Sequence, residues 1–160
     1  MTNIQSSRPV PLRLPSLAVF LVVAVGISSL IGVFAVPGEW YAGLSKPPFN
    51  PPNWVFAPVW LALYFCIGFA GWLVWRREPR SLAMGLWAAQ MGLNWMWSPV
   101  FFRLQAPWPA AAIIVSILAL IIGFIVTANR IDRRAAWLFV PYAAWVGFAS
   151  ALNIAIAILN

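Results

Sequence analysis

The sequence of 160 residues contains no histidine, a single cysteine and only three acidic residues. Without histidine, His-based catalytic triads, His-rich metal sites and the commonest haem ligand are excluded. The lone Cys66 excludes an intrachain disulfide and a cysteine metal cluster. Glu39, Glu78 and Asp132 lie in connections between apolar segments, and no two of them are close in sequence. We therefore expect no catalytic constellation, no metal site and no obligatory cofactor.

Charge is also scarce, at 8% of residues, whereas 63% are apolar and 16% are aromatic, including eleven tryptophans. Mean hydropathy is +0.87, which leaves too little polar surface for a water-soluble domain. The net charge of +7 comes from arginines in short clusters between apolar runs. That arrangement is typical of charge beside a bilayer, so we expect the lipid bilayer, and not nucleic acid, as the partner of these side chains.

Five apolar segments are long enough to cross the hydrocarbon core, which takes about 20 helical residues. They are residues 17–36, 55–75, 81–102, 106–128 and 135–159. The segments show no alternation of apolar and polar residues, which excludes the strands of a membrane barrel. The predicted fold is an all-α integral membrane protein. It has an N-terminal tail of residues 1–16 and one domain of residues 17–160, a five-transmembrane-helix bundle.

The connections between these segments are short except for residues 37–54, which contain five prolines. Proline fixes the backbone angle φ, so we expect this proline-rich loop to be stiff and non-helical. A long loop among short ones is often functional, for example as a lid, and this loop is predicted to cap a pocket. A plain connector is the alternative.

Basic residues are distributed unequally between the two ends of the predicted bundle. The end with the N-terminus carries Arg8, Arg13, Arg76, Arg77, Arg80, Arg130, Arg133 and Arg134, and the other end carries Lys46 and Arg103. The positive-inside rule then predicts a bacterial inner membrane protein with a cytoplasmic N-terminus and with the proline-rich loop and the C-terminus outside. The rule carries less weight in an outer membrane, which remains an alternative.

Polar and aromatic side chains follow helical spacing within three of the segments. They are Trp60 and Tyr64 in the second, Gln90, Asn94, Trp97 and Ser98 in the third, and Tyr142, Trp145, Ala149 and Asn153 in the fifth. These positions fall in the half of the bundle beneath the proline-rich loop. They predict a capped cavity for a flat, largely apolar ligand. Alternatively, Gln90, Asn94 and Asn153 serve only as hydrogen bonds between helices.

The remaining features of the spans have simpler interpretations. The first and fourth segments contain few polar residues and are predicted to be scaffold. Tryptophans near segment ends are predicted to anchor the protein at the membrane interface, namely Trp54, Trp72, Trp75, Trp108 and Trp137. Small residues four apart, Gly85 with Ala89 and Ala88 with Gly92, permit a dimer, although such pairs are common in spans rich in alanine and glycine.

Three ordered motifs in the chain resemble signatures of the TspO/MBR family, the tryptophan-rich sensory proteins related to the mitochondrial translocator protein. The first covers residues 40–64 (WYAGLSKPPFNPPNWVFAPVWLALY). The others cover residues 89–102 (AQMGLNWMWSPVFF) and 140–153 (VPYAAWVGFASALN). The resemblance implies a five-helix bundle, usually a homodimer. Its pocket beneath the first loop would bind tetrapyrroles such as protoporphyrin IX and haem.

The resemblance also implies roles for individual residues. Trp60 and Trp145 match two tryptophans tied to porphyrin binding and breakdown, and they are the only catalytic candidates. The other matched ligand-binding positions are Tyr41, Pro51, Tyr64, Asn94, Trp97, Ser98, Ala149 and Leu152, to which the polar stripe adds Gln90. The C-terminal residues 152–160 (LNIAIAILN) lack the tyrosine and basic residue of the animal sterol-recognition pattern, which favours a bacterial origin.

The function predicted from these features is a membrane receptor or transporter-like protein for porphyrins, involved in tetrapyrrole handling and stress regulation. One alternative is light- and oxygen-dependent porphyrin degradation, and another is a sensor that signals to a cytoplasmic partner through its arginine-rich links. Axial ligation of haem would need a sulfur or tyrosine ligand, and the sulfur candidates are Cys66, Met84, Met91 and Met96. Metal-free porphyrin or loosely held haem is therefore the expected ligand.

Overall fold

The computed structural model describes residues 14–35 and 37–160, and within these ranges every regular element is a helix. The elements are α1 (Leu14–Leu21), η1 (Val22–Ile27), α2 (Ser28–Phe34), α3 (Glu39–Gly43), η2 (Asn53–Val55), α4 (Phe56–Arg77), α5 (Leu82–Ser98), η3 (Pro99–Arg103), α6 (Pro107–Ala128) and α7 (Arg133–Leu159). Most of the predicted tail, residues 1–13, and Val36 at the end of the first predicted segment lie outside the described residues.

Four continuous helical stretches are long and apolar enough to cross a membrane: Leu14–Phe34, Asn53–Arg77, Pro107–Ala128 and Arg133–Leu159. The chain is thus an all-helical integral membrane protein. The predicted segment 81–102 corresponds to α5, which has 17 residues, followed by the π-helical turn η3. The change in helix type falls at Pro99, whose nitrogen has no hydrogen to donate to the helix ladder.

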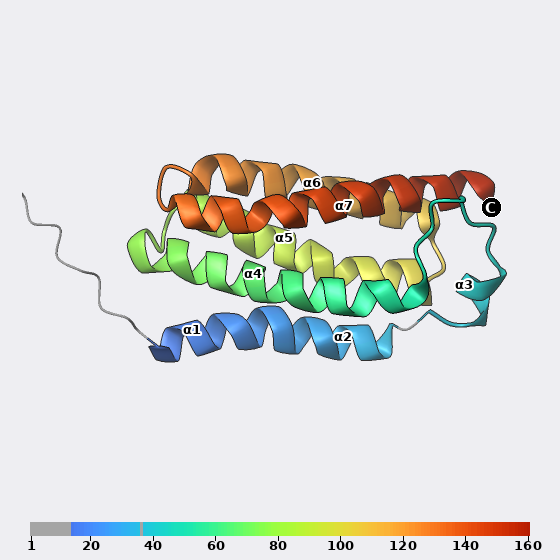
Figure 1. Ribbon diagram of the computed structural model, residues 1–160, viewed down its shortest axis with the longest axis horizontal. Coiled ribbons are helices and arrows are strands. Elements are labelled where there is room, and N and C mark those ends of the chain that lie inside the picture. The colour runs from blue at the N-terminus through green and yellow to red at the C-terminus, as the bar shows by residue number, and fades with distance from the viewer. Residues whose placement is uncertain (1–13, 36) are drawn as a thin grey trace, which may run out of the picture.

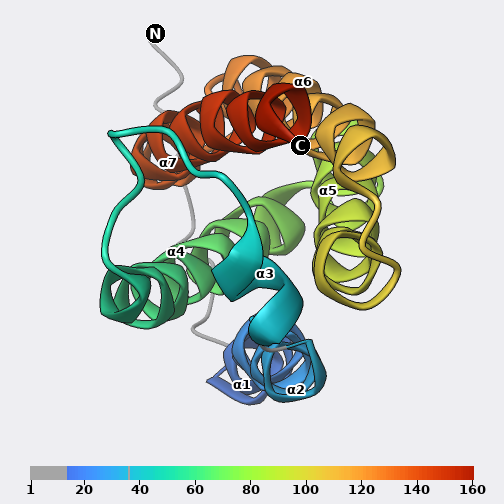
Figure 2. The same cartoon turned by 90° about the vertical axis from the view of Figure 1, so that its right-hand side faces the viewer.

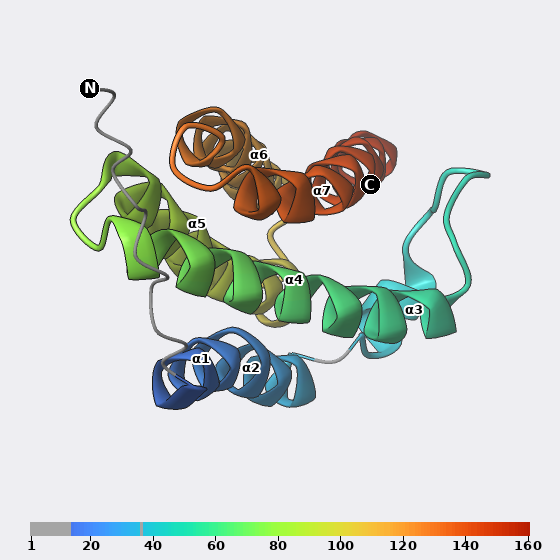
Figure 3. The same cartoon turned by 60° about the vertical axis from the view of Figure 1, so that its left-hand side comes forward.

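The first of these stretches, α1–η1–α2 (Leu14–Phe34, the first span), lies apart from the others. Figures 1 and 3 show it alongside α4, on the side of α4 that faces away from α6 and α7. Its hydrophobic surface stays largely uncovered, with only 11% of the span buried, whereas 44% of the α4 and α7 stretches is buried. The first span therefore packs along one side of α4, and most of its surface faces outward.

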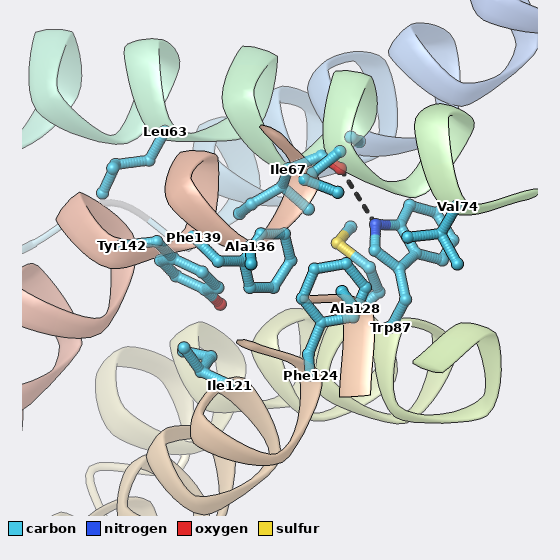
Figure 4. Close-up of a cluster of buried hydrophobic side chains, with 14 of the residues drawn as sticks. Leu63, Ile67, Val74, Trp87, Ile121, Phe124, Ala128, Ala136, Phe139 and Tyr142 are labelled. Atoms are coloured by element: carbon cyan, nitrogen blue, oxygen red, sulfur yellow. Dashed lines mark hydrogen bonds between the residues drawn. The ribbon is translucent and has the colours of Figure 1, made fainter. Parts of the chain in front are cut away.

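The core of this bundle is built from aromatic and branched side chains in the half distant from the proline-rich loop (Figure 4). The rings of Phe124 and Phe139 join α6 to α7 with 3.9 Å between their centroids. Trp87 of α5 donates its indole N–H to the carbonyl of Ile67 in α4, at 2.9 Å. This close approach depends on Gly71, because a Cβ there would lie 2.5 Å from the Trp87 ring.

The proline-rich loop closes the end of the bundle where α4 begins and α7 ends. Figure 2 looks onto this end and shows α3 lying across the space between α2, α4 and α5. The expectation of a wholly non-helical loop is wrong, because α3 forms in the proline-free stretch Glu39–Gly43. The loop is also tied to the C-terminal end of α7: the Asn160 side chain accepts from Ser45 N at 2.9 Å and donates to Ser45 O at 3.0 Å.

Candidate functional site

A cavity of about 840 Å³ lies beneath the proline-rich loop. Its walls come from α2, α4, α5 with η3, and α7, and α3 contributes to the end that faces the loop. Ligand pockets for drug-sized molecules typically measure about 300–1,000 Å³. The cavity is therefore large enough for an organic ligand of that size, at the place where the sequence predicted one.

Most of the residues predicted to bind a ligand line this cavity. They are Tyr41, Trp60, Tyr64, Asn94, Trp97, Ser98, Ala149 and Leu152. Their helical spacing explains the convergence, since positions four apart on α4, α5 and α7 point to one side of each helix. Asn153, the last polar residue of the stripe on α7, also lines the wall.

The other three predicted residues lie outside the cavity lining. Gln90 is fully buried one turn deeper on α5. The ring of Trp145 packs against Phe56 and Phe148, with centroid distances of 5.8 and 5.7 Å, and its indole nitrogen is buried without a hydrogen-bond partner. Pro51 lies in the loop, where its carbonyl accepts a hydrogen bond from Asn50 Nδ2 at 3.2 Å.

A chain of hydrogen bonds leads from the cavity into the bundle. Tyr64 Oη donates to Asn94 Oδ1 at 2.9 Å, and Asn94 Nδ2 donates to Tyr142 Oη at 3.1 Å. Tyr142 in turn donates to Gln90 Oε1 at 2.9 Å. The chain joins α4, α5 and α7, so it fixes the orientation of Asn94 in the cavity wall while satisfying buried polar groups.

A second polar contact fixes an aromatic wall of the cavity. Trp97 Nε1 donates to Asn153 Oδ1 at 3.0 Å, and Asn153 Nδ2 donates to the carbonyl of Pro107 at 2.9 Å. The Trp97 ring stacks on Phe101 with 5.5 Å between centroids and 20° between planes. Across the cavity lining, Trp60 stacks on Tyr64 at 5.4 Å and 27°. The cavity therefore presents flat aromatic surfaces that are held in place by neighbouring side chains.

Sequence reasoning missed the contribution of the first span, which was predicted to be scaffold. Residues of α2 line the cavity, namely Ser28, Ser29, Ile31, Gly32 and Val33. Ser28 Oγ accepts a hydrogen bond from Trp95 Nε1 at 3.0 Å, which joins α2 to α5. The sequence does contain an indication of this cavity face, namely the small residues Ser28 and Gly32, which are four apart. Such residues do not stand out in a hydropathy pattern.

Two tryptophans line the cavity although the sequence did not assign them to it. Trp54, assigned to the membrane interface, lines the cavity mouth although its side chain is 74% exposed. Trp95 lines the wall next to Ser28. The fold therefore brings more of the aromatic residues to the cavity than helical spacing alone indicated.

Tyr41 of α3 supplies the side of the cavity that faces the loop. Its side chain is buried, and its hydroxyl donates to Asn50 Oδ1 at 3.3 Å. Lys46 Nζ lies 4.8 Å from the centre of the Tyr41 ring and donates to the carbonyls of Ala42 and Leu44. Burial raises the pKa of the Tyr41 hydroxyl, so it stays protonated and remains a hydrogen-bond donor at neutral pH.

The chemistry of the lining is that of a binding site. The described lining residues are apolar, aromatic, hydroxyl or amide side chains, with no ionisable carboxylate, amine or guanidinium among them. The sulfur atoms considered as haem ligands, in Cys66, Met84, Met91 and Met96, lie outside this lining. Among the described lining residues, tyrosine hydroxyls at Tyr41 and Tyr64 are the strongest available metal donors. The lining therefore suits a flat ligand held by aromatic contacts and a few neutral hydrogen bonds.

Comparison with known proteins gives the same family as the three sequence motifs. Residues 18–159 match the TspO/MBR family. The chain is 40% identical over 147 residues to the tryptophan-rich protein TspO of Archaeoglobus fulgidus, covering 89% of this chain and 94% of that protein.

Two further relatives come from a bacterium and an animal. The chain is 35% identical over 145 residues to the tryptophan-rich sensory protein of Cereibacter sphaeroides, covering 89% and 92% of the two chains. It is 34% identical over 139 residues to the human translocator protein, covering 82% of each. With an all-helical membrane fold and a family match across nearly the whole chain, this protein is an integral membrane protein of the TspO/MBR family.

Proposed function

We propose that the protein binds porphyrins, with protoporphyrin IX or loosely held haem in the cavity beneath the proline-rich loop, as a receptor or transporter-like protein in tetrapyrrole handling and stress regulation. The observation that carries the proposal is the cavity itself, whose lining combines flat aromatic rings with a few neutral polar groups. The family resemblance, rather than the geometry, selects porphyrins among flat apolar ligands.

In this proposal Trp60, Tyr64 and Trp97 contact the faces of the macrocycle. Their rings line the cavity and are held by stacking and by hydrogen bonds to Asn94 and Asn153. Asn94 and Ser98 bond to polar substituents, and Tyr41 contributes from the loop side. A metal-free macrocycle requires no axial ligand, which agrees with the lack of sulfur side chains in the described lining.

We further propose that α5 with η3 crosses the membrane, which makes five spans and places the proline-rich loop over the outer mouth of the cavity. The support is that α5 packs closely against α6 and that most of its residues are apolar, with the polar residues Gln90, Asn94 and Ser98 turned toward the bundle or the cavity. In a bacterial inner membrane this arrangement has a cytoplasmic N-terminus and an outside C-terminus.

A homodimer through α5 belongs to the same proposal. The support is a surface of small residues on that helix: Gly85, Ala88 and Ala89 are exposed, and a Cβ at Gly85 or Gly92 would meet no atom within 4 Å. Such a surface allows the backbone of a second copy to approach closely.

The binding test is a titration of the purified protein with protoporphyrin IX, followed by quenching of tryptophan fluorescence. We expect Trp60→Leu to weaken binding about tenfold, because a stacked aromatic contact worth roughly 1–2 kcal/mol is lost. Trp108→Leu is the matched control, since Trp108 is 59% exposed and lies outside the cavity lining. Trp145→Leu should have a smaller effect, transmitted through Phe56.

Two results would contradict the proposal. One is unchanged affinity in the Trp60→Ala, Trp145→Ala double variant, which would remove the proposed stacking site. The other is equal weakening by Trp108→Leu, which would indicate that porphyrin associates with the outer surface of the protein instead of the cavity.

A second candidate function, light- and oxygen-dependent degradation of the bound porphyrin, is favoured by one observation. Trp60 provides an oxidisable ring in the cavity wall. Illumination of the complex should then bleach the Soret band faster in the wild type than in Trp60→Leu, measured at equal occupancy. Bleaching at the same rate in both proteins would count against this function.

A further inference from the structure

Part of the cavity wall faces the surrounding membrane instead of the proline-rich loop. On α2, Ser29, Gly32 and Val33 line the cavity and are also exposed on the outside of the bundle. On α4, Ala57 and Leu61 do the same. The packing of the helices adds a second observation, because α1 and η1 pack closely on α4 whereas α2 makes few contacts with it. The cavity therefore reaches the lateral surface between α2 and α4 (the α2–α4 seam).

The packing of the first span explains why the seam lies there. In its first half, α1 and η1 pack on α4, where Gly68 lets the helices approach so closely that a Cβ would lie 3.0 Å from the carbonyl oxygen of Phe20. In its second half, α2 is tied to α5 and η3. The ties are the bond from Trp95 to Ser28 and a bond of 2.6 Å from Arg103 Nε to the carbonyl of Phe34.

The first span changes its packing partner from α4 to α5 just after η1, which is a π-helical turn. Figure 2 shows the resulting position of α2, with α4 on one side of it and α5 on the other. Ser28, at the inner end of the seam, is buried and bonded to Trp95 of α5. The opening therefore lies nearer the loop, between Ser29–Val33 and residues 57–61.

The edges of the opening match the bilayer interior. Val33 is 70% exposed and Leu61 is 46% exposed, and both present only hydrocarbon. On the aqueous side, α3 and the loop lie over the cavity and Asn160 ties the loop at Ser45, while Trp54 is exposed at the mouth that remains there. A flat apolar molecule concentrates in the membrane, so the seam is the shorter and less polar way into the cavity.

We infer that ligands enter and leave the cavity sideways from the lipid, through the α2–α4 seam, with Gly32 keeping the passage wide enough. The inference rests on the proposed function in that it concerns the same cavity and the same class of flat, membrane-soluble ligand. A Cβ at Gly32 would meet no atom within 4 Å, so the space in front of this residue is open.

The test fills this space and measures rates separately from affinity. In lipid nanodiscs, stopped-flow fluorescence gives the association and dissociation rates of protoporphyrin IX for Gly32→Leu and for the wild type. We expect the association rate and the dissociation rate both to fall about tenfold, because a narrowed passage raises the barrier in both directions.

Gly26→Leu is the matched control. Gly26 is an exposed glycine of the same span, outside the cavity lining, where a Cβ would have an ordinary contact of 3.7 Å with Val22. Its rates should equal those of the wild type. A second variant, Asn160→Ala, loosens the loop and should leave both rates unchanged.

Three outcomes would overturn the inference. Unchanged rates in Gly32→Leu would show that the seam is not the route. Faster exchange in Asn160→Ala would identify the loop as the gate. Weaker binding in Gly32→Leu without slower association would place Gly32 in the binding wall instead of the passage. Failure of the proposed function is distinct from these, since the wild type itself would then show no saturable binding.

Discussion

Asn94 shows how one side chain can serve both the fold and the cavity. Its amide is held between Tyr64 and Tyr142, and the same side chain lines the cavity. The sequence left two interpretations for the polar stripe of α5, ligand contact or hydrogen bonding between helices. In the structure the stripe divides by depth: Gln90 bonds only within the bundle, Asn94 does both, and Ser98 lies in the cavity wall.

The buried hydrogen-bond chain can be tested at Tyr142. Tyr142→Phe leaves Asn94 Nδ2 without its acceptor and Gln90 Oε1 without its donor. We expect a loss of about 1–2 kcal/mol in the free energy of unfolding, measured by thermal or denaturant unfolding in detergent. Gln90→Leu should lower the free energy of unfolding less in the Tyr142→Phe background than in the wild type. In that background it removes the Gln90 oxygen that Tyr142→Phe has left without its donor. Strictly additive losses would show that the two side chains are not coupled.

At the scale of the helices, close approach between α4 and its neighbours depends on glycine. Gly71 lies directly against the ring of Trp87, and Gly68 lies against the backbone of the first span. Sequence reasoning found the four confirmed spans because their length and apolar content suffice. It could not tell which glycines face a neighbouring helix, because that depends on the rotation of each helix about its axis.

Gly71→Ala should destabilise the protein by about 1–3 kcal/mol, because the new methyl group overlaps the buried Trp87 ring and strains its bond to Ile67. Gly147→Ala is the control: it also replaces a helical glycine, but a Cβ there would meet no atom within 4 Å, so it should be neutral or stabilising by about 0.5–1 kcal/mol. Thermal unfolding of the two variants under the same detergent conditions gives the comparison. Equal midpoints would contradict the close packing at Gly71.

The elements that escaped prediction share a physical cause. The helix α3 is too short to produce a periodic pattern, and the π-helical turns η1 and η3 differ from α-helix only in their hydrogen bonding. The role of α2 was missed because its cavity face consists of small residues. Each of these features depends on contacts between segments distant in sequence, such as the bond between Trp95 and Ser28.

Across the whole molecule, charge is gathered at one end. The α4–α5 and α6–α7 turns lie together, away from the proline-rich loop, and these turns and the adjoining ends of α4 and α7 carry six arginines (Figure 1). There Arg77 Nε pairs with Asp132 Oδ2 at 3.2 Å, and Asp132 caps the start of α7 by accepting from Arg134 N at 3.0 Å. The ion pair therefore links the end of one long helix to the start of another.

The orientation proposed for the membrane follows from this distribution and is testable with fusions. With five spans, green fluorescent protein at the N-terminus should fluoresce inside the cell, and alkaline phosphatase at the C-terminus should be active outside it. Both reporters on the same side would mean that α5 does not cross the bilayer. The reversed pattern would mean that the arginine-rich end faces outward.

The low burial of the first span has a consequence for how the protein is assembled. Only 11% of the apolar window of this span is buried, so most of its surface faces lipid and it is long and apolar enough to insert as a separate helix. The cavity, however, has no wall on that side until α2 docks against α5 through Ser28. Docking of this helix therefore completes the binding site, and a ligand held between α2 and α4 would add to the contacts that keep the helix in place.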